Sequence, residues 1–417
     1  MNDMAKPILL FIPHYIGSLK YFEKLIPYLE HKYDVGFLFL PKVKKIYLPE
    51  MINYCLKNNY KYYLIERYSP NKFLTKIPIY RTLAMLFCYK KQVKELLKDS
   101  RIKKFISSLD TNFYFHYLFD EANKVGIDTM VLQWAITTKF VIDKHIKQNN
   151  PSLRQKLTGI LLKYITGLNP KKENFIGNGN SKKFGVINKQ AYDLFKNAGV
   201  NEKKLSIVNY LDFYFARKTY RELDSDPQKK EKLMQRYNIN PEKKNIIIYS
   251  TPFNTKDYAR NTEFALSDNA QLAYYQDLIR MIRNDFNTDE ADILFKIHPA
   301  EDINLYKPLE QQNVKLYGKD TVNEEIITVA DLYIAHHSTT NFIPILTGKD
   351  AIFINFIGDK SIDFLKKHFG IKKFVSDKKE FQKLIADFKN NRLEKQYELT
   401  EEIYVPDSLN KIINWIG

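Results

Sequence analysis

Along the first half of the chain, short apolar runs alternate with stretches of helical spacing. The runs that predict buried strands are Pro7–Pro13, Val35–Leu40, Tyr62–Ile65, Lys104–Ile106, Thr129–Gln133, Phe184–Asn188 and Leu205–Val208. The stretches that predict helices are Tyr21–Leu29, Leu83–Leu97 and Gln190–Asn197. This alternation is typical of an open sheet of parallel strands covered by helices.

A second alternating series begins at Asn245. Its predicted strands are Ile246–Tyr249, Ile293–Ile297, Val314–Tyr317, Leu332–Ala335 and Ile352–Phe356. Its predicted helices are Leu272–Asn284, Glu324–Ala330, a short one that opens with Phe342–Leu346 and ends at Gly348, and a last one at Asn410–Trp415. The stretch 217–244 between the two series is charged and polar, with one predicted helix at Gln228–Tyr237.

The two series predict an α/β protein with two doubly wound, Rossmann-like domains that face each other across a cleft. We expect a first domain over 1–216, a linker and helix over 217–244 and a second domain over 245–400. A C-terminal helical segment over 401–417 can cross back to the first domain. A length of 417 residues suits two domains. Ligands of such sheets bind beyond the carboxyl ends of the strands, so the polar residues there are candidates for the site.

Cysteine content and the N-terminus predict a cytoplasmic protein. The two cysteines, Cys55 and Cys88, are too few for a disulfide framework and fit a reducing compartment. The apolar run Ile8–Ile12 is too short for a signal-peptide core and is closed by Pro13. No stretch approaches the roughly 18 apolar residues of a membrane-spanning helix.

The positive charge is confined to the first half. Residues 1–200 hold 33 Lys and Arg against 15 Asp and Glu, a balance of +18, whereas residues 201–417 balance at −1. A basic half attracts phosphates, nucleic acid or anionic lipid, although a solvated lysine-rich surface explains it as well.

The stretch Lys144–Lys172 combines basic residues with apolar residues at helical spacing, and Tyr80–Lys98 is similar. This pattern is typical of a helix on an anionic membrane, and equally of a core-facing helix with a basic solvated face. The residues predicted to form this membrane or acceptor surface are Lys147, Arg154, Lys156, Lys163, Lys171 and Lys172.

Three polar loops of the second series follow predicted strands. Lys296, His298 and Pro299 end one strand, and His298 can donate a hydrogen bond to a phosphate. A second loop holds His337, Ser338, Thr339 and Thr340 before a helix, where hydroxyls and backbone amides bind anions. Ser250 and Thr251 form the third loop, and Glu263 and Glu324 are weaker candidates for base or ribose recognition. Each also has a plain structural explanation: a strand-end histidine, a helix cap or a turn.

The first series offers three candidate bases. His14 lies in its first strand–helix turn, where imidazole suits removal of a hydroxyl proton, and Gly17 nearby would let an acceptor approach the backbone. Asp110 and Asp120 are the alternatives, and His14 can equally be a packing histidine. The histidines and cysteines lack metal-ligand spacing, and phosphate-loop and dinucleotide motifs are missing, so we expect neither metal nor cofactor.

The second half resembles the GT-B-fold transferases that build bacterial surface polymers, which include CDP-glycerol glycerophosphotransferases, polysialyltransferases and capsule Kdo transferases. The segments that carry the resemblance are Ile246–Phe253, Phe295–Asp302 and Ala330–Phe356, with Phe184–Val208 before the linker. In that group a His-Pro motif and a Ser-Ser or Ser-Thr motif hold the phosphate of a cytidine-nucleotide donor. The resemblance assigns these roles to His298, Ser338 and Thr339.

Two departures from the group leave the catalytic base open. Several members have Gln-His-Gly where this chain has Gln133-Trp134-Ala135. The acidic pair followed by glycine that supplies the base in polysialyltransferases is represented only by Asp120-Glu121-Ala122.

The expected function is a metal-independent glycosyl- or glycerophosphoryl-transferase that needs no cofactor. Its expected partners are a nucleotide-activated, cytidine-linked donor, a growing or lipid-linked capsule, lipopolysaccharide or teichoic-type glycan, and the anionic inner face of the bacterial plasma membrane. We expect no nucleic-acid partner. Two alternatives remain: a UDP-sugar 2-epimerase, which shares the architecture, and a basic nucleic-acid-binding protein.

Overall fold

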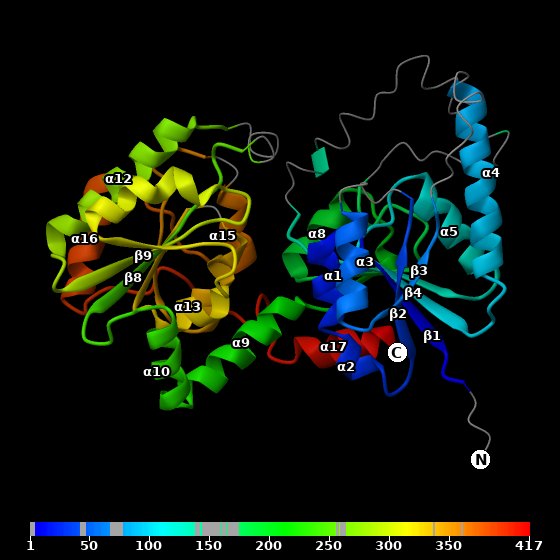
Figure 1. Cartoon of the computed structure of the whole chain (residues 1–417), viewed down its shortest axis with the longest axis horizontal. Coiled ribbons are helices and arrows are strands. Elements are labelled where there is room, and N and C mark those ends of the chain that lie inside the picture. The colour runs from blue at the N-terminus through cyan, green and yellow to red at the C-terminus, as the bar shows by residue number, and fades with distance from the viewer. Residues whose placement is uncertain are drawn as a thin grey trace. The chain divides into compact units, whose positions relative to one another are not determined.

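The computed structural model describes residues 5–41, 47–66, 78–137, 142–143, 160, 164, 175–255, 258, 264–336, 338–359 and 362–417. The chain divides into two compact units, Met1–Leu211 with Ser408–Gly417 and Asp212–Asp407. Each unit contains one sheet of parallel strands with helices on both faces (Figure 1). The prediction of two doubly wound, Rossmann-like domains is therefore confirmed. Each unit is described by itself, and the cleft expected between them stays a prediction.

The first unit contains a seven-stranded sheet of order β3-β2-β1-β4-β5-β6-β7. Its strands are β1 Ile8–Ile12, β2 Asp34–Phe39, β3 Lys61–Leu64, β4 Ile102–Ser107, β5 Asp128–Leu132, β6 Lys183–Val186 and β7 Leu205–Ile207. Its helices are α1 Ile16–Glu23, α2 Ile26–Leu29, α3 Leu48–Lys57, α4 Pro78–Leu96, α5 Phe113–Lys124, α8 Lys189–Asn197, the 3-10 helix η2 Glu202–Lys204 and the C-terminal α17 Ser408–Ile416.

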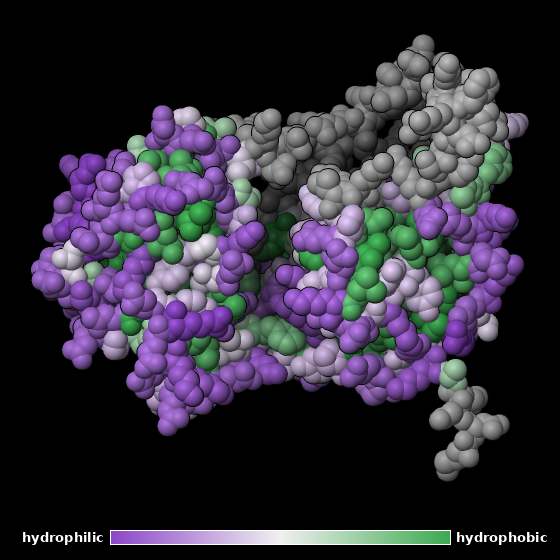
Figure 2. All heavy atoms as spheres, viewed as in Figure 1, coloured by the Kyte–Doolittle hydropathy of each residue, from purple (hydrophilic) through white to green (hydrophobic). Residues whose placement is uncertain are grey.

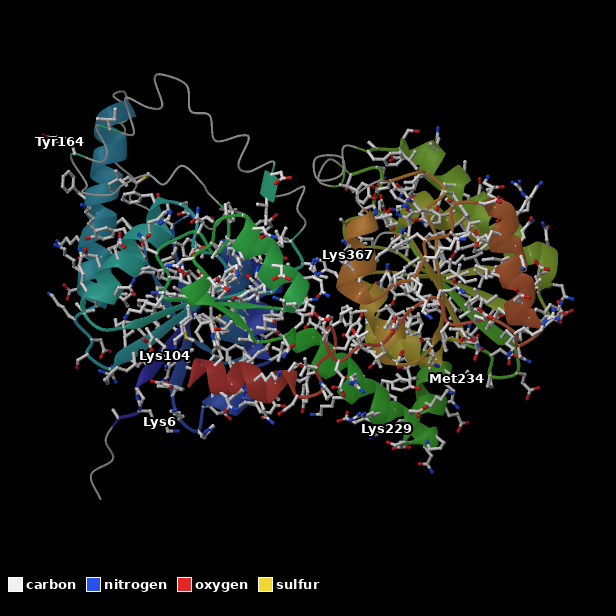
Figure 3. All side chains as sticks on the ribbon, turned by 180° about the vertical axis from the view of Figure 1, so that it is seen from behind. Lys6, Lys104, Tyr164, Lys229, Met234 and Lys367 are labelled. Atoms are coloured by element: carbon white, nitrogen blue, oxygen red, sulfur yellow. The ribbon has the colours of Figure 1, made fainter. Side chains whose placement is uncertain are left out.

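Helix α17 lies against the first unit although it follows the second in sequence. A Cβ atom at Gly185 would come within 3.1 Å of the Trp415 ring, so the glycine allows the helix to approach β6 closely. The Tyr33 hydroxyl donates a hydrogen bond of 2.6 Å to the carbonyl of Gly417. Lys104, at the amino-terminal end of β4, lies beside the same helix (Figure 3) and is 3.2 Å from Asp128.

The second unit contains a five-stranded sheet of order β10-β9-β8-β11-β12. Its strands are β8 Lys244–Tyr249, β9 Ala291–Lys296, β10 Val314–Tyr317, β11 Leu332–Ala335 and β12 Asp350–Phe353. Its helices are α9 Leu211–Asp224, α10 Pro227–Arg236, α12 Asp268–Asp285, α13 Asn323–Val329, α14 Phe342–Leu346, α15 Asp363–Phe369, α16 Lys378–Lys389 and the 3-10 helices η3 Ile303–Gln312 and η4 Thr339–Asn341.

The apolar strands of the second unit are buried on both faces. Ile246 and Ile248 point to the face that α12, η3 and α16 cover, where they join one large apolar cluster. The opposite face carries the ring pair Tyr249–Tyr333, whose centroids are 5.1 Å apart, and α13 lies against it (Figure 1), with Asn323 3.3 Å from the Tyr249 hydroxyl. Burial of both faces explains why these strands read as continuous apolar runs. Polar side chains cover most of the outer surface that Figure 2 shows.

In both sheets the first strand lies in the interior and the chain changes direction beside it. The first sheet grows from β1 through β2 to β3 and then resumes with β4 on the other side of β1. The second sheet grows from β8 through β9 to β10 and resumes with β11 on the other side of β8. The switch points therefore lie between β1 and β4 and between β8 and β11, where loops diverge to opposite faces and ligands bind.

Several helices differ from the sequence prediction. The predicted helix Tyr21–Leu29 is wrong as one element, because the chain forms α1 and α2, with Pro27 in the first turn of α2. Part of the predicted linker is helical, since α9 runs to Asp224. The sequence pattern did not predict η3 or α16.

The predicted membrane or acceptor surface lies largely outside the described residues. Lys147, Arg154, Lys156, Lys163, Lys171 and Lys172 all belong to the part of the chain that the structure leaves undescribed. In that stretch Ile160 and Tyr164 are described, and they are 61% and 92% exposed; Tyr164 is labelled in Figure 3. Within the described ranges, none of the helices is both long and apolar enough to cross a membrane.

Candidate functional site

The central loops of the second unit meet at the carboxyl edge of its sheet. They follow β8 at Ser250, β9 at Ile297 and β11 at His336. Strand β8 lies between β9 and β11, so the two outer loops are about 10 Å apart, and the loop with Ser250 lies between them. The topology therefore brings together the three loops that the sequence singled out.

His298 presents a neutral hydrogen-bond donor at this edge. The backbone N–H of Ala300 donates a hydrogen bond of 3.1 Å to Nδ1 of His298, so Nδ1 is the acceptor and Nε2 carries the proton. The residue is exposed. Surrounding protein atoms, and secondly the charge of Lys296, lower the pKa of His298 to about 4. At neutral pH its Nε2–H group can therefore donate to a phosphate oxygen as an uncharged imidazole.

Lys296 forms hydrogen bonds with backbone carbonyls through its side chain. Its side chain is buried, and Nζ donates hydrogen bonds to the carbonyls of Gly318 at 2.8 Å and Ile297 at 3.2 Å. Burial lowers the pKa of Lys296. These hydrogen bonds connect the end of β9 to the loop after β10, so they give Lys296 a structural role. The predicted contact of Lys296 with a nucleotide stays a prediction. Pro299 is exposed beside His298 in the same turn.

Hydrogen bonds to neighbouring residues of the second unit fix the loop after β8. Ser250 is buried, and its hydroxyl accepts a hydrogen bond of 2.7 Å from the backbone N–H of His298 and donates to Glu301. Thr251 is also buried, and its backbone N–H donates to the hydroxyl of Tyr275 at 2.6 Å. Ser250 and Thr251 thus shape the loop around His298. The sequence analysis did not single out Glu301. The one feature of the sequence that could have indicated it is the position of an acidic residue three places after a histidine at the end of a strand.

Ser338 caps the turn after β11. Its hydroxyl accepts a hydrogen bond of 3.2 Å from the backbone N–H of Thr340 and lies 2.6 Å from the hydroxyl of Thr340. The Tyr333 hydroxyl, 3.2 Å from that of Thr340, donates to Asn341 at 2.8 Å. The geometry shows the capping role, and phosphate binding by this loop stays a prediction. His337 and the side chain of Thr339 lie outside the described residues.

A buried polar cluster beneath this loop was also missed. Nε2 of His336 lies 2.9 Å from Oδ1 of Asn355, which accepts a hydrogen bond of 2.9 Å from the backbone N–H of Asp359. The carboxylate of Asp359 accepts a hydrogen bond of 2.7 Å from Tyr258. The cluster joins the chain after β8, β11 and β12. Glu324 lies in the first turn of α13, half-buried, and Glu263 is outside the described residues.

In the first unit, His14 lies at the switch point of the sheet. It follows β1, and its Nδ1 is 2.8 Å from the hydroxyl of Ser108, which follows β4. The rings of Tyr15 and Trp134 flank it, with centroid distances of 4.6 and 5.3 Å. A Cβ atom at Gly17 would meet the Tyr15 ring at 2.6 Å, which explains the glycine by packing. These contacts fix the ring of His14 at the position where a ligand of this sheet would bind.

Asp110 and Asp120 are placed differently. The carboxylate of Asp110 is buried and accepts hydrogen bonds from the backbone N–H groups of Gly177 and Gly179 and from the hydroxyl of Ser181, all at 2.8–2.9 Å. This environment suits a structural carboxylate, and we do not retain Asp110 as a base. Asp120 is half-buried on α5 and accepts a hydrogen bond of 2.7 Å from Asn180. The assignment of His14 as the catalytic base stays a prediction.

The comparisons with known proteins establish the architecture. No protein-family model and no curated protein sequence matches the chain. Among solved structures, UDP-GlcNAc 2-epimerase from Neisseria meningitidis bound to UDP-GlcNAc has a TM-score of 0.60 at 11% identity, over 98% of both chains. The chain has the GT-B fold. The 2-epimerase from Methanocaldococcus jannaschii has a TM-score of 0.55 at 12% identity, over 98% of this chain and 99% of that one.

A polymer-forming enzyme shares the fold as well. The wall teichoic acid polymerase TagF, as a variant with CDPG, has a TM-score of 0.53 at 11% identity, over 100% of this chain and 89% of that one. Likeness at such identities extends to the fold alone, so the activity has to be argued from the site. In the described part of the chain, no group of three or more His, Cys, Asp or Glu side chains could hold a metal ion.

Replacement of Asp110 tests its structural role. Asp110→Ala would leave the buried donors at residues 177–181 without their acceptor, so we expect a loss of about 2–4 kcal/mol in the free energy of unfolding. Asp120→Ala, which removes a half-buried partner of one side chain, should cost about 1 kcal/mol or less. Urea denaturation of both variants measures the difference. Equal stability of Asp110→Ala and the wild type would return Asp110 to the list of candidate bases.

The neutral state of His298 predicts how nucleotide binding depends on pH. Because its pKa is about 4, raising the pH from 6 to 8 removes no proton from the ring, and protonation begins only as the pH falls toward 4. We expect the affinity for CDP-glycerol, whose substituted phosphates do not titrate in this range, to change less than about twofold. Isothermal titration across this pH range measures it. A loss of about tenfold as the pH rises through 6.5, absent from His298→Ala, would show that a charged histidine binds the phosphate.

Proposed function

We propose that the protein is a metal-independent transferase that uses a nucleotide-activated donor, most specifically a cytidine-linked sugar or glycerol phosphate. The observation that carries the proposal is the neutral Nε2–H donor of His298 at the carboxyl edge of the second sheet. The GT-B fold adds support, because solved structures with this fold hold UDP-GlcNAc or CDPG. The acceptor in this proposal is a hydroxyl of a bacterial capsule, lipopolysaccharide or teichoic-type glycan.

The second unit holds the donor and stabilises the leaving group in this proposal. When the bond between the donor carbon and the phosphate oxygen breaks, negative charge gathers on the departing nucleotide. In this proposal His298 donates a hydrogen bond to that phosphate, and hydroxyls of the loop Ser338–Thr340 assist it. Fixed donors in a site that excludes water stabilise such charge without a metal ion. For a glycerophosphoryl donor, the bond that breaks is the one between phosphorus and the nucleotide oxygen.

His14 of the first unit activates the acceptor. It takes the proton from the acceptor hydroxyl while the oxygen forms its new bond to the donor. The hydrogen-bond contact with Ser108 restricts rotation of the imidazole, as a third group does for the base of other catalytic sites. The basic first half is proposed to hold the growing glycan at the inner face of the plasma membrane, through the stretch Lys144–Lys172.

One observation favours a second function, a UDP-sugar 2-epimerase. The N. meningitidis and M. jannaschii 2-epimerases have TM-scores of 0.60 and 0.55, whereas TagF with CDPG has 0.53. An epimerase would share the nucleotide site at His298 and would need no acceptor hydroxyl. The fold accommodates both reactions, so only the fate of the donor distinguishes them.

Nucleotide binding is the first test of the proposal. We expect isothermal titration to detect at least one of CMP, CDP, UMP and UDP. His298→Ala should weaken that binding by about tenfold or more, because a hydrogen bond to a charged phosphate is lost. His14→Ala should bind as the wild type does and lose turnover by about 100-fold or more. If none of the four nucleotides binds the wild-type protein, both proposed functions fail.

The fate of an intact donor decides between the two functions. Proton NMR of UDP-GlcNAc with the protein alone would show a new epimer if the chain were an epimerase. For a transferase, we expect no epimer and release of nucleotide from a cytidine-linked donor only when a glycan acceptor is added.

A further inference from the structure

The carboxylate of the half-buried Glu301 connects the two loops that frame His298. Glu301 accepts hydrogen bonds from the hydroxyls of Ser250 and Tyr306 and from the side-chain amide of Gln271. Ser250, Gln271 and Tyr306 are at most 1% exposed. The network thus joins the chain after β8, the chain after β9, helix α12 and the 3-10 helix η3 below the site.

Each hydrogen bond in this network has a fixed direction. Ser250 has one hydroxyl proton, which goes to Glu301, so its oxygen is left to accept from the backbone N–H of His298 at 2.7 Å. Oε1 of Gln271 accepts from the backbone N–H of Asn254 at 2.8 Å, which leaves its amide nitrogen for the carboxylate. Glu301 therefore determines which way Ser250 and Gln271 point, and through them it orients both loops.

The same residue also shapes the turn that carries the imidazole. The backbone N–H of Glu301 donates a hydrogen bond of 2.9 Å to the carbonyl of His298, and the N–H of Ala300 donates to the ring at Nδ1. Burial raises the pKa of Glu301, against the effect of its three hydrogen-bond donors. A carboxylate that is partly removed from water in this way is stabilised by the hydrogen-bond donors around it.

We propose that Glu301 is a positioning residue that holds the Nε2–H donor of His298 in place for a nucleotide phosphate, by way of Ser250 and the turn 298–301. The inference rests on the proposed nucleotide site and adds a residue to it. Glu301 itself does not touch the phosphate, since its carboxylate is directed into the protein toward Ser250, Gln271 and Tyr306.

Four variants test the proposal in the full chain. Glu301→Ala removes the acceptor, and Glu301→Gln keeps an oxygen that can accept from Ser250. Ser250→Ala removes the link to the backbone of His298. Glu310→Ala is the matched control, because Glu310 is an exposed acid on η3, the 3-10 helix that follows Glu301 and carries Tyr306. The measurements are the affinity for CDP-glycerol by titration, the ¹⁵N shifts of the His298 ring, assigned with His298→Gln, and thermal unfolding.

We expect Glu301→Ala to weaken binding by about 10- to 100-fold and Ser250→Ala by about 10-fold, since buried donors lose their acceptor. In both variants the His298 ring should change from a single Nε2–H tautomer to a mixture. Glu301→Gln should bind within about fivefold of the wild type and keep the tautomer, and Glu310→Ala should change nothing.

Wild-type affinity and an unchanged ring in folded Glu301→Ala would overturn the proposal. If Glu301→Ala fails to fold, Ser250→Ala and Glu301→Gln test the proposal. Wild-type affinity together with wild-type ring shifts in Ser250→Ala would contradict the proposal. Loss of nucleotide binding in a stably folded Glu301→Gln would contradict it as well. If the wild-type protein binds no nucleotide, the proposed function fails, and the ring shifts still report whether Glu301 positions His298.

Discussion

The parallel ladder that pairs β8 with β9 on one side and with β11 on the other fixes the position of every loop in the candidate nucleotide site. Tyr249 is in register with Lys296 of β9 and with Ala335 of β11, so all three strands end at the same level of the sheet. The ladder continues one step further, where the backbone N–H of Ser250 donates to the carbonyl of Lys296 at 3.0 Å. A slip of one residue would turn His298 and Ser250 to the opposite faces of the sheet.

Much of the fold could be predicted from the sequence because these strands are buried on both faces and read as uninterrupted apolar runs. Runs such as Ile246–Tyr249 and Leu332–Ala335 were predicted to within two residues of the observed strands. Helices with mixed surfaces were harder. The charged face of α9 concealed its helical period, and Pro27 divides one predicted helix into two. The strand order within each sheet, and hence the switch points, depends on long-range pairing that local patterns do not contain.

The candidate site was predictable at the level of loops and less so at the level of side chains. Polar residues that follow predicted strands lie at the carboxyl edge of the sheet, and this pattern singled out His298, Ser250 and the loop Ser338–Thr340. The sequence could not separate a side chain that faces a ligand from one that holds a loop. Lys296 and Asp110 were predicted to be a nucleotide-binding and a catalytic group, and in the structure both side chains form hydrogen bonds with backbone atoms. Glu301 was missed because only the folded chain brings Ser250, Gln271 and Tyr306 around it.

A crystal structure of the full chain with CDP-glycerol tests the central claim most directly. The account predicts a donor phosphate oxygen at about 2.7–3.2 Å from Nε2 of His298, with Nδ1 still accepting from Ala300. It also predicts that the phosphate lies at the carboxyl edge of β8, β9 and β11. Donor density confined to the first unit, or a phosphate out of hydrogen-bonding reach of His298, would contradict the account.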